Sequence, residues 1–162
     1  MTMTEVPAPI SQLAEDEKLF ADSVYEFADQ EIRPLVQSMD EQAKIPKELI
    51  QKLFDLGVMG IEIPEQYNGA GASFFHSVLA VEALSRVDPS IGVFVDVQNT
   101  LFINALLRWG SEELKGRYFP RLAKDAVGAY ALSEAGSGSE AFAMAARAKK
   151  VDDDFVLDGR KL

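Results

Sequence analysis

The stretch "GAYALSEAGSGSEAFAMAARAKK", residues 128–150, decides the fold class of this chain. Gly136, Gly138 and Ala141 give it the spacing G-x-G-x-x-A, directly after residues whose composition predicts a strand. In a Rossmann fold this spacing forms the turn between a strand and a helix, and an acidic residue about 20 positions later binds a ribose. Asp158 lies near that distance. Alternatively, the glycines allow a loop of another fold to bring its backbone amides against a phosphate.

Three features disfavour the Rossmann alternative. Residues 133–135 separate the strand from the first glycine, and the chain ends at Leu162 without room for the remaining sheet. Asp158-Gly159 predicts a tight turn between two short strands, where a Rossmann fold requires a parallel crossover. We therefore favour a buried strand, "AVGAYALSE", followed by a phosphate-binding loop. Ser133 and Ser139 would supply hydroxyl donors at the two ends of that loop.

The residues before this stretch predict helices. Apolar residues at helical spacing predict a long amphipathic helix over 13–39, kinked at Pro34. The run over 88–110 is apolar nearly all round, which predicts a buried central helix. Further helices are predicted over 47–56, 73–86 and 111–124.

The order of these elements predicts the fold class. Helices come first and strands follow, which indicates a mainly α chain: an all-helical domain over 1–125, then the first strands of a β-domain over 126–162. Residues 141–150 fit a helix and a strand equally well. The acidic residues 152–154 predict a solvated turn.

Composition excludes several classes of function. The formal net charge of −10 disfavours binding to nucleic acid or to an anionic membrane surface. The chain has no cysteine and His76 is its only histidine, so it has no disulfide and no predicted zinc site. No apolar run approaches the ~20 residues that a membrane span requires. The N-terminus lacks the pattern of a secretory signal or a mitochondrial presequence, as expected for a bacterial cytoplasmic protein or a matrix protein whose presequence has been removed.

The end of the chain resembles a known family. "YALSEAGSGSEAFAMAARAKKVDDDFVLDGRKL", residues 130–162, is similar to the flavin-binding signature of the acyl-CoA dehydrogenases, an aromatic residue followed by x-x-[ST]-E-x-x-[AG]-G-S-[DE]. The upstream stretches 39–74, 84–94 and 109–113 also agree, in the expected order. "LSEAGSGSEAF" and "VQNTL" look most like the short/branched-chain subfamily. Ala135 and Glu140 depart mildly from the usual proline and aspartate.

The resemblance implies an FAD-dependent oxidoreductase of fatty acid metabolism or amino acid degradation. In this family a glutamate removes an α-proton from an acyl-CoA and the flavin accepts a hydride from the β-carbon. Family members are more than twice as long as this chain, and their base lies in the later part. The resemblance therefore implies an N-terminal portion without a C-terminal helical domain and without a catalytic residue. Glu134 and Glu140 are expected to stabilise the loop through backbone amides.

The resemblance also assigns binding residues. Ser133 matches the hydroxyl that hydrogen-bonds the flavin ring, and Ser139 matches a residue that touches both the phosphate side of the flavin and the CoA pantetheine. Tyr130 and Leu132 match positions flanking the isoalloxazine, and Gly138 acts through its backbone. On the helix over 88–110, four residues match the end of the acyl pocket, with plain helix packing as the alternative: Val93, Phe94, Val97 and Leu101.

The expected partners follow from the same resemblance. They are an acyl-CoA substrate, an electron-transferring flavoprotein as acceptor, and further copies of the chain in a homotetramer. Because later strands and a neighbouring subunit complete the family's site, residues 1–162 alone are expected to bind FAD weakly and to be inactive. Two alternatives stay open: a non-catalytic helical interaction module, and a flavin oxidase or monooxygenase on the same fold.

Overall fold

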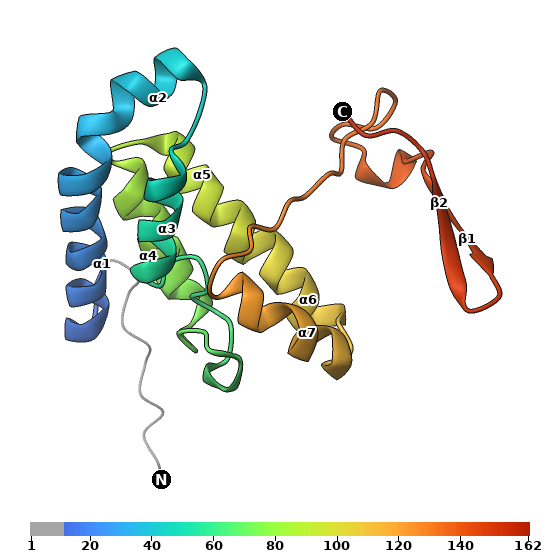
Figure 1. Cartoon of the computed structure of the whole chain (residues 1–162), viewed down its shortest axis with the longest axis horizontal. Helices are drawn as coiled ribbons and strands as arrows, with labels where there is room; N and C mark the ends of the chain where they lie inside the picture. Colours follow the sequence, from blue (N-terminus) through green and yellow to red (C-terminus); the bar gives the residue numbers. More distant parts are fainter. Residues whose placement is uncertain (1–11) are drawn as a thin grey trace, which may run out of the picture. The chain divides into compact units, whose positions relative to one another are not determined.

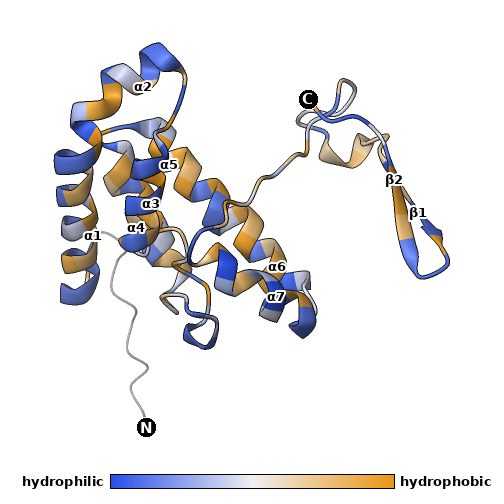
Figure 2. Ribbon diagram, viewed as in Figure 1, coloured by the Kyte–Doolittle hydropathy of each residue, from blue (hydrophilic) through white to orange (hydrophobic). Residues whose placement is uncertain are grey.

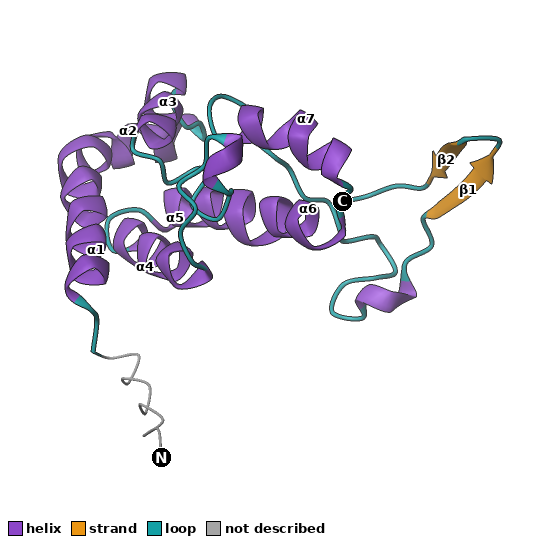
Figure 3. Ribbon diagram, turned by 90° about the horizontal axis from the view of Figure 1, so that it is seen from below, coloured by secondary structure: helices purple, strands orange, loops and turns teal. Residues whose placement is uncertain are grey.

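The computed structural model describes residues 12–162, and it divides the chain into two compact units (Figure 1). The first ends at Gly128 and consists of helices, and the second covers Ala129–Leu162 and contains a two-stranded sheet. Figure 3 shows the preponderance of helix, which confirms the mainly α fold class. Residues 1–11, on which the prediction about a leader rests, lie outside the described residues.

The first predicted helix is kinked, as expected from Pro34. Helix α1 spans Glu15–Phe27 and α2 spans Val36–Gln42. Between them the backbone passes through a π-turn, Ala28–Ile32, and a 3-10 turn, Arg33–Leu35. Proline has no N–H to donate to the helical ladder, so the regular pattern of hydrogen bonds changes around it.

Two more helices complete the first half of the helical unit. Helix α3, Lys47–Asp55, begins after Pro46 and is followed by Gly57, whose φ of +86° suits a residue without a side chain. Helix α4, Phe74–Ser85, packs against α1 on one side and α5 on another (Figure 1). Both helices lie within one or two residues of their predicted bounds.

The predicted central helix is a continuous helical run that changes type in its middle. Helix α5, Pro89–Asp96, leads into a π-helix, Val97–Ile103, and then into α6, Asn104–Trp109. The carboxylate of Asp88 begins the run by accepting a 2.7 Å hydrogen bond from the amide of Ser90. Helix α7, Glu112–Leu122, follows and is capped by the hydroxyl of Ser111, which accepts from the amide of Leu114 at 3.2 Å.

Two sequence predictions about this run need correction. It is only partly buried, because Val93 is 59% and Trp109 is 79% exposed. Its 21 residues are also long and apolar enough, by length and composition, to cross a membrane, contrary to the expectation that no such run exists. Figure 2 shows the apolar residues along α5. Polar side chains near the middle of the run, Gln98 and Asn99, are fully buried within the helical unit, as in the core helix of a folded domain.

The core of the helical unit consists of two clusters. The larger joins α1, α3, α4 and α5 through side chains such as Leu53 and Leu84, both fully buried. The smaller lies around α6 and α7 and contains Ile63, Ile103, Phe119 and Leu122. Burial of these side chains, at roughly 25 cal/mol per Å² of apolar surface, is the main force that holds the helices together.

The second unit contains a single hairpin among its described residues. Strands β1, Arg147–Val151, and β2, Asp154–Asp158, pair antiparallel, with Val151 opposite Asp154. The turn is therefore Asp152-Asp153, and Asp152 has the left-handed φ of +54° that aspartate tolerates. The solvated acidic turn is confirmed, and residues 147–150 of the ambiguous stretch form a strand.

Two β predictions were wrong. Asp158-Gly159 ends β2 instead of joining two strands. The predicted strand "AVGAYALSE" has no strand structure over 126–133, and most of these residues are exposed. A strand exists through hydrogen bonds to a neighbouring strand, and β1 and β2 pair only with each other in the described part of the chain. Composition alone predicted the strand, but composition supplies no partner.

Candidate functional site

The glycine-rich stretch forms a tight loop that closes on itself. The backbones of Glu134 and Ser137 exchange two hydrogen bonds, of 2.9 and 3.1 Å. The hydroxyl of Ser137 donates to the carbonyl of Glu140 at 2.8 Å. A side chain added at Gly136 or Gly138 would meet nothing within 4 Å. The loop therefore presents exposed backbone at both glycines. The surrounding described residues would leave room for a larger side chain at either position.

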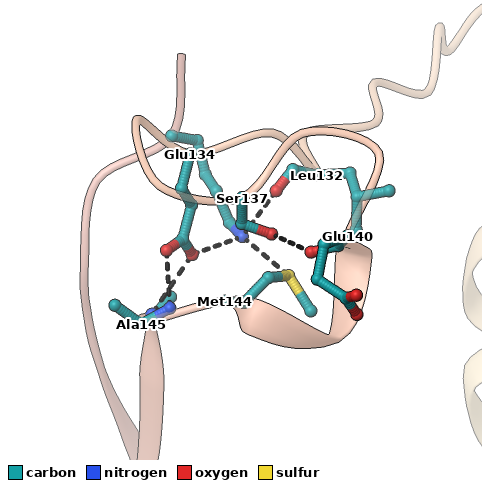
Figure 4. A network of polar contacts seen from close by, with 8 residues as sticks. Leu132, Glu134, Ser137, Glu140, Met144 and Ala145 are labelled. Carbon is teal, nitrogen blue, oxygen red and sulfur yellow. Dashed lines mark hydrogen bonds and ion pairs between the residues drawn. The ribbon is translucent and has the colours of Figure 1, made fainter.

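Glu134 stabilises this loop from inside. Its buried carboxylate accepts hydrogen bonds from the amides of Ala145 at 2.7 Å and Ala146 at 3.1 Å (Figure 4). It also forms an ion pair of 2.8 Å with Lys161. The hydrogen bond from Lys161 and then that from Ala145 lower the pKa of Glu134 below its ordinary value. The expected structural role of Glu134 is confirmed, and its carboxylate is engaged in holding backbone.

The five predicted flavin-binding residues lie in this one stretch of the second unit. Tyr130 is 50% exposed, Leu132 is half-buried, and Ser133, Gly138 and Ser139 are exposed. Across the described residues 12–162, the hydroxyls of Ser133 and Ser139 have no hydrogen-bond partner. Both hydroxyls are therefore free to donate to a ligand, and their binding roles stay predictions.

The four predicted acyl-pocket residues lie in the helical unit. Val93 is 59% and Leu101 is 38% exposed, whereas Phe94 and Val97 are half-buried. Phe94 packs against the larger core cluster, so part of its side chain serves helix packing, as the alternative interpretation expects. The π-helix begins at Val97 and adds residues to each turn, which changes the direction in which Leu101 points relative to an ideal α-helix. Their role toward a substrate also stays a prediction.

Asn99 fixes two segments of the helical unit, and sequence reasoning missed it. It is completely buried in the π-helix. Its side-chain oxygen accepts from the amide of Ile61 at 3.0 Å, and its nitrogen donates to the carbonyls of Val58 at 2.8 Å and Val95 at 3.0 Å. The carbonyl of Val58 and the amide of Ile61 thereby find their hydrogen-bond partners in a side chain instead of in a neighbouring strand.

Gln98 fixes the exit of the chain from the helical unit in the same way. Its nitrogen donates to the carbonyls of Leu122 at 3.2 Å and Ala126 at 3.1 Å, and its oxygen accepts from the amide of Gly128 at 2.7 Å. A Cβ at Gly128 would lie 2.4 Å from the ring of Phe102, so only glycine fits there. The available signal was two adjacent amide side chains near the middle of a mainly apolar helical run.

Metal chemistry has no visible basis in the part of the chain that the structure describes. No group of three or more His, Asp or Glu side chains there is arranged to hold a metal ion. His76 instead lies 2.9 Å from the hydroxyl of Ser73, through Nδ1, and its ring meets the edge of Phe20.

The helical unit matches a family model. Residues 14–126 match the model described as acyl-CoA dehydrogenase, N-terminal domain. The chain belongs to the acyl-CoA dehydrogenase family. The loop over 130–140 lies beyond the residues of that match.

Individual relatives extend the likeness of this acyl-CoA dehydrogenase chain to nearly its whole length. A probable short/branched chain specific acyl-CoA dehydrogenase of Dictyostelium discoideum is 47% identical over 94% of this chain and 37% of its own length. The mitochondrial short/branched chain specific acyl-CoA dehydrogenase of Bos taurus is 42% identical over 96% of this chain and 36% of its own. A structure of the glutaryl-CoA dehydrogenase of Mycobacterium smegmatis in complex with FADH2 superimposes with a TM-score of 0.84 at 36% identity, over 91% of this chain and 38% of that one. This chain thus spans little more than a third of these relatives.

Proposed function

We propose that the protein containing this chain is an FAD-dependent acyl-CoA dehydrogenase that forms the α,β double bond of short or branched acyl-CoA thioesters. The observation that carries the proposal is the 47% identity, over nearly the whole chain, to a relative named for short/branched-chain substrates. The proposal includes an electron-transferring flavoprotein as acceptor and a homo-oligomeric protein. The site of action is the bacterial cytoplasm or the mitochondrial matrix.

The loop has the properties that a flavin site requires. Its glycines leave room for a phosphate to approach the backbone, since no atom of the described residues lies within 4 Å of a Cβ placed at Gly138. The free hydroxyl of Ser133 would donate to the flavin ring, and that of Ser139 to the phosphate side and the pantetheine. When bound, the flavin supplies the acceptor for the hydride of the β-carbon.

The carboxylate of Glu134 does not suit the α-proton abstraction. Glu134 accepts three hydrogen bonds and has a lowered pKa, so it is a weak base and is not free to reach a substrate. As the family resemblance implies, we place the base in a part of the protein outside these residues. The role of this chain is to orient the flavin and to limit the acyl group.

Two loop variants test the cofactor site. In the protein expressed from its complete reading frame, Gly138→Val and Ser139→Leu would place bulk where the phosphate and pantetheine approach. Neither position is crowded by the chain itself, so a loss of flavin would report on the ligand and not on folding. We expect both variants to be purified with substantially less FAD per polypeptide than the wild type.

A matched control is available in helix α7. Gly116 is exposed and a Cβ there also meets nothing within 4 Å, so Gly116→Val should retain full flavin content. Full flavin in both loop variants would show that the loop assignment is wrong. A wild-type protein without flavin would instead support the non-catalytic module, and rapid reaction of the reduced protein with oxygen would support an oxidase or monooxygenase.

Substrate size tests the acyl-pocket proposal. Truncating Phe94 to alanine removes volume from a half-buried position on α5, so we expect the optimum to move toward longer acyl chains. Each methylene is worth ~1–3 kcal/mol in such a pocket, so the change should be graded. The measurement is kcat/KM over straight and branched acyl-CoA substrates, with Leu114→Ala on α7 as an exposed apolar control. A profile identical to that of the wild type would exclude this helix as the determinant of chain length.

A further inference from the structure

Lys161 makes an unusually complete set of contacts with the glycine-rich loop. Its ammonium donates to the carbonyl of Leu132 at 2.9 Å, to Oε1 of Glu134 at 2.8 Å and to the sulfur of Met144 at 3.2 Å. An ammonium has three N–H groups, so these acceptors use all of them. The side chain is 30% exposed, and that of its partner Glu134 is 7% exposed.

The residue after Lys161 completes the contact. The amide of Leu162 donates to the carbonyl of Ser133 at 3.0 Å. Three consecutive residues, 132–134, are therefore each bound by the segment 161–162, through two main-chain carbonyls and one carboxylate. The sequence offered no sign of this pairing, because the partners are 29 residues apart at Leu132 and 27 at Glu134.

These contacts leave one functional group free. The backbone of Ser133 is held on both sides and through its own carbonyl, but its hydroxyl has no partner in the described chain. A hydroxyl on a fixed backbone has only its own rotation to lose when it binds a ligand, so its hydrogen bond forms with less entropic cost.

We propose that Lys161 is a positioning residue that fixes Ser133 for its hydrogen bond to the flavin ring. This inference rests on the proposed function, because it takes the flavin as the ligand of Ser133. Lys161 does not contact the ligand in this account; it acts through the backbone of residues 132–134. Glu134 contributes to the same arrangement by joining Lys161 to the amides of Ala145 and Ala146.

The geometry predicts which replacements can substitute for lysine. Methionine at position 161 retains a similar length but has no donor, so it leaves the carbonyl of Leu132 and the carboxylate of Glu134 without this partner. Arginine keeps the charge, but its donors are fixed in a planar fork and cannot converge from one nitrogen on three acceptors. We expect Lys161→Arg to rescue only part of the effect of Lys161→Met.

The test is a double-mutant cycle on FAD affinity, in apoprotein prepared from the complete reading frame. The variants are Lys161→Met, Ser133→Ala and the double variant, each titrated with FAD. A hydrogen bond that involves a charged group is worth enough to change affinity by about 10-fold or more, which is the expected effect of Lys161→Met. If Lys161 acts through Ser133, the replacement Lys161→Met should lower FAD affinity clearly less in the Ser133→Ala background than in the wild type. The visible absorption spectrum of bound flavin should shift in both single variants.

Lys149→Met is the matched control, because Lys149 lies on β1, is exposed, and its side chain makes no hydrogen bond or ion pair with the described residues. It should leave FAD affinity and spectrum unchanged. Additive effects in the cycle would overturn the positioning role and leave Lys161 as a general stabiliser of the unit. Should Lys161→Met not yield folded protein, Lys161→Gln carries the same cycle.

The outcomes separate this inference from the function on which it rests. A wild-type protein that does not bind FAD refutes both. A wild-type protein that binds FAD with the affinity lowered by Ser133→Ala, combined with an additive cycle, refutes the positioning role alone.

Discussion

The two units of this chain differ in the force that stabilises each of them internally. All the buried apolar side chains of the described residues lie between Val24 and Leu122, within the helical unit. In the second unit the buried side chains are polar, Glu134 and Ser137, while Phe142 is 98% and Leu157 is 79% exposed. The first unit is stabilised by burial of apolar surface, and the second by hydrogen bonds of its hairpin and of the Glu134 carboxylate.

This contrast bears on how the loop with the five predicted flavin-binding residues keeps its shape. A loop in a unit without an apolar core cannot rely on packing to hold its shape. In this chain an internal network of hydrogen bonds fulfils that task, centred on Glu134 and Lys161. The network leaves the exposed hydroxyls of Ser133 and Ser139 without a partner among the described residues, as the proposed binding roles require.

Phe119→Ala gives the largest expected effect and tests the force that holds the helical unit. Phe119 is completely buried in the smaller cluster and its ring centroid lies 5.4 Å from that of Tyr67. Its truncation should lower the free energy of unfolding by about 3–5 kcal/mol, because a cavity adds to the lost burial. The measurement is urea unfolding of the full chain, followed by far-ultraviolet circular dichroism. Leu114→Ala on the same helix, at a position 40% exposed, should cost much less.

Gln98→Leu tests the polar contacts inside the helical unit. Leucine has a comparable volume but leaves the carbonyls of Leu122 and Ala126 and the amide of Gly128 without this partner. The expected loss is about 1–3 kcal/mol. Hydrogen exchange at Gly128 should accelerate in the variant. Gln37→Leu, at an exposed position on α2, serves as control, and equal losses in the two variants would contradict the role given to Gln98.

The Glu134 network should respond to pH, as a local effect in the second unit. Because the folded-state pKa is lowered, the carboxylate stabilises the folded state above the ordinary glutamate pKa, and this contribution is lost as pH falls through the lowered value. Amide exchange of Ala145 and Ala146, corrected for intrinsic rates, should therefore speed up at acidic pH. The variant Glu134→Gln should show no such acid transition at these two amides. A transition of equal size in that variant would assign it to another group.

The helices could be predicted from sequence because their signals are local. Pro46, Gly57 and the pair Asp88-Pro89 mark the beginnings and ends that the structure has. The strand predicted over 126–134 is absent from the structure, and local signals could not show this, since a strand depends on a partner distant in sequence. The hairpin turn was misplaced for a related reason. Asp152-Asp153 and Asp158-Gly159 are both good turn sequences, and only the pairing of β1 with β2 decides between them.

The candidate site was predictable to a similar extent. The loop and the structural role of Glu134 followed from sequence, while the binding roles of the loop residues stay predictions. Lys161 did not, because its three acceptors come together only in the folded chain. The sequence analysis missed the π-helix and the buried amides of Gln98 and Asn99. Helical periodicity is read from the spacing of apolar residues, and it does not indicate which polar side chains hydrogen-bond to backbone.

Leu157→Thr has the smallest expected effect and gives the sharpest view of the second unit. Leu157 lies on β2 opposite Ala148 and is already 79% exposed, so its replacement removes almost no burial. Threonine is also well suited to a strand, and the free energy of unfolding should change by no more than about 0.5 kcal/mol. Val95→Thr is the matched comparison in the helical unit, where a nearly isosteric change puts a hydroxyl into a fully buried position and should cost about 1–3 kcal/mol. Urea unfolding of both variants measures the two changes in the free energy of unfolding. If Leu157→Thr destabilised the chain as much as Val95→Thr does, the hairpin would be buried in solution, and the second unit would owe its stability to apolar contacts after all.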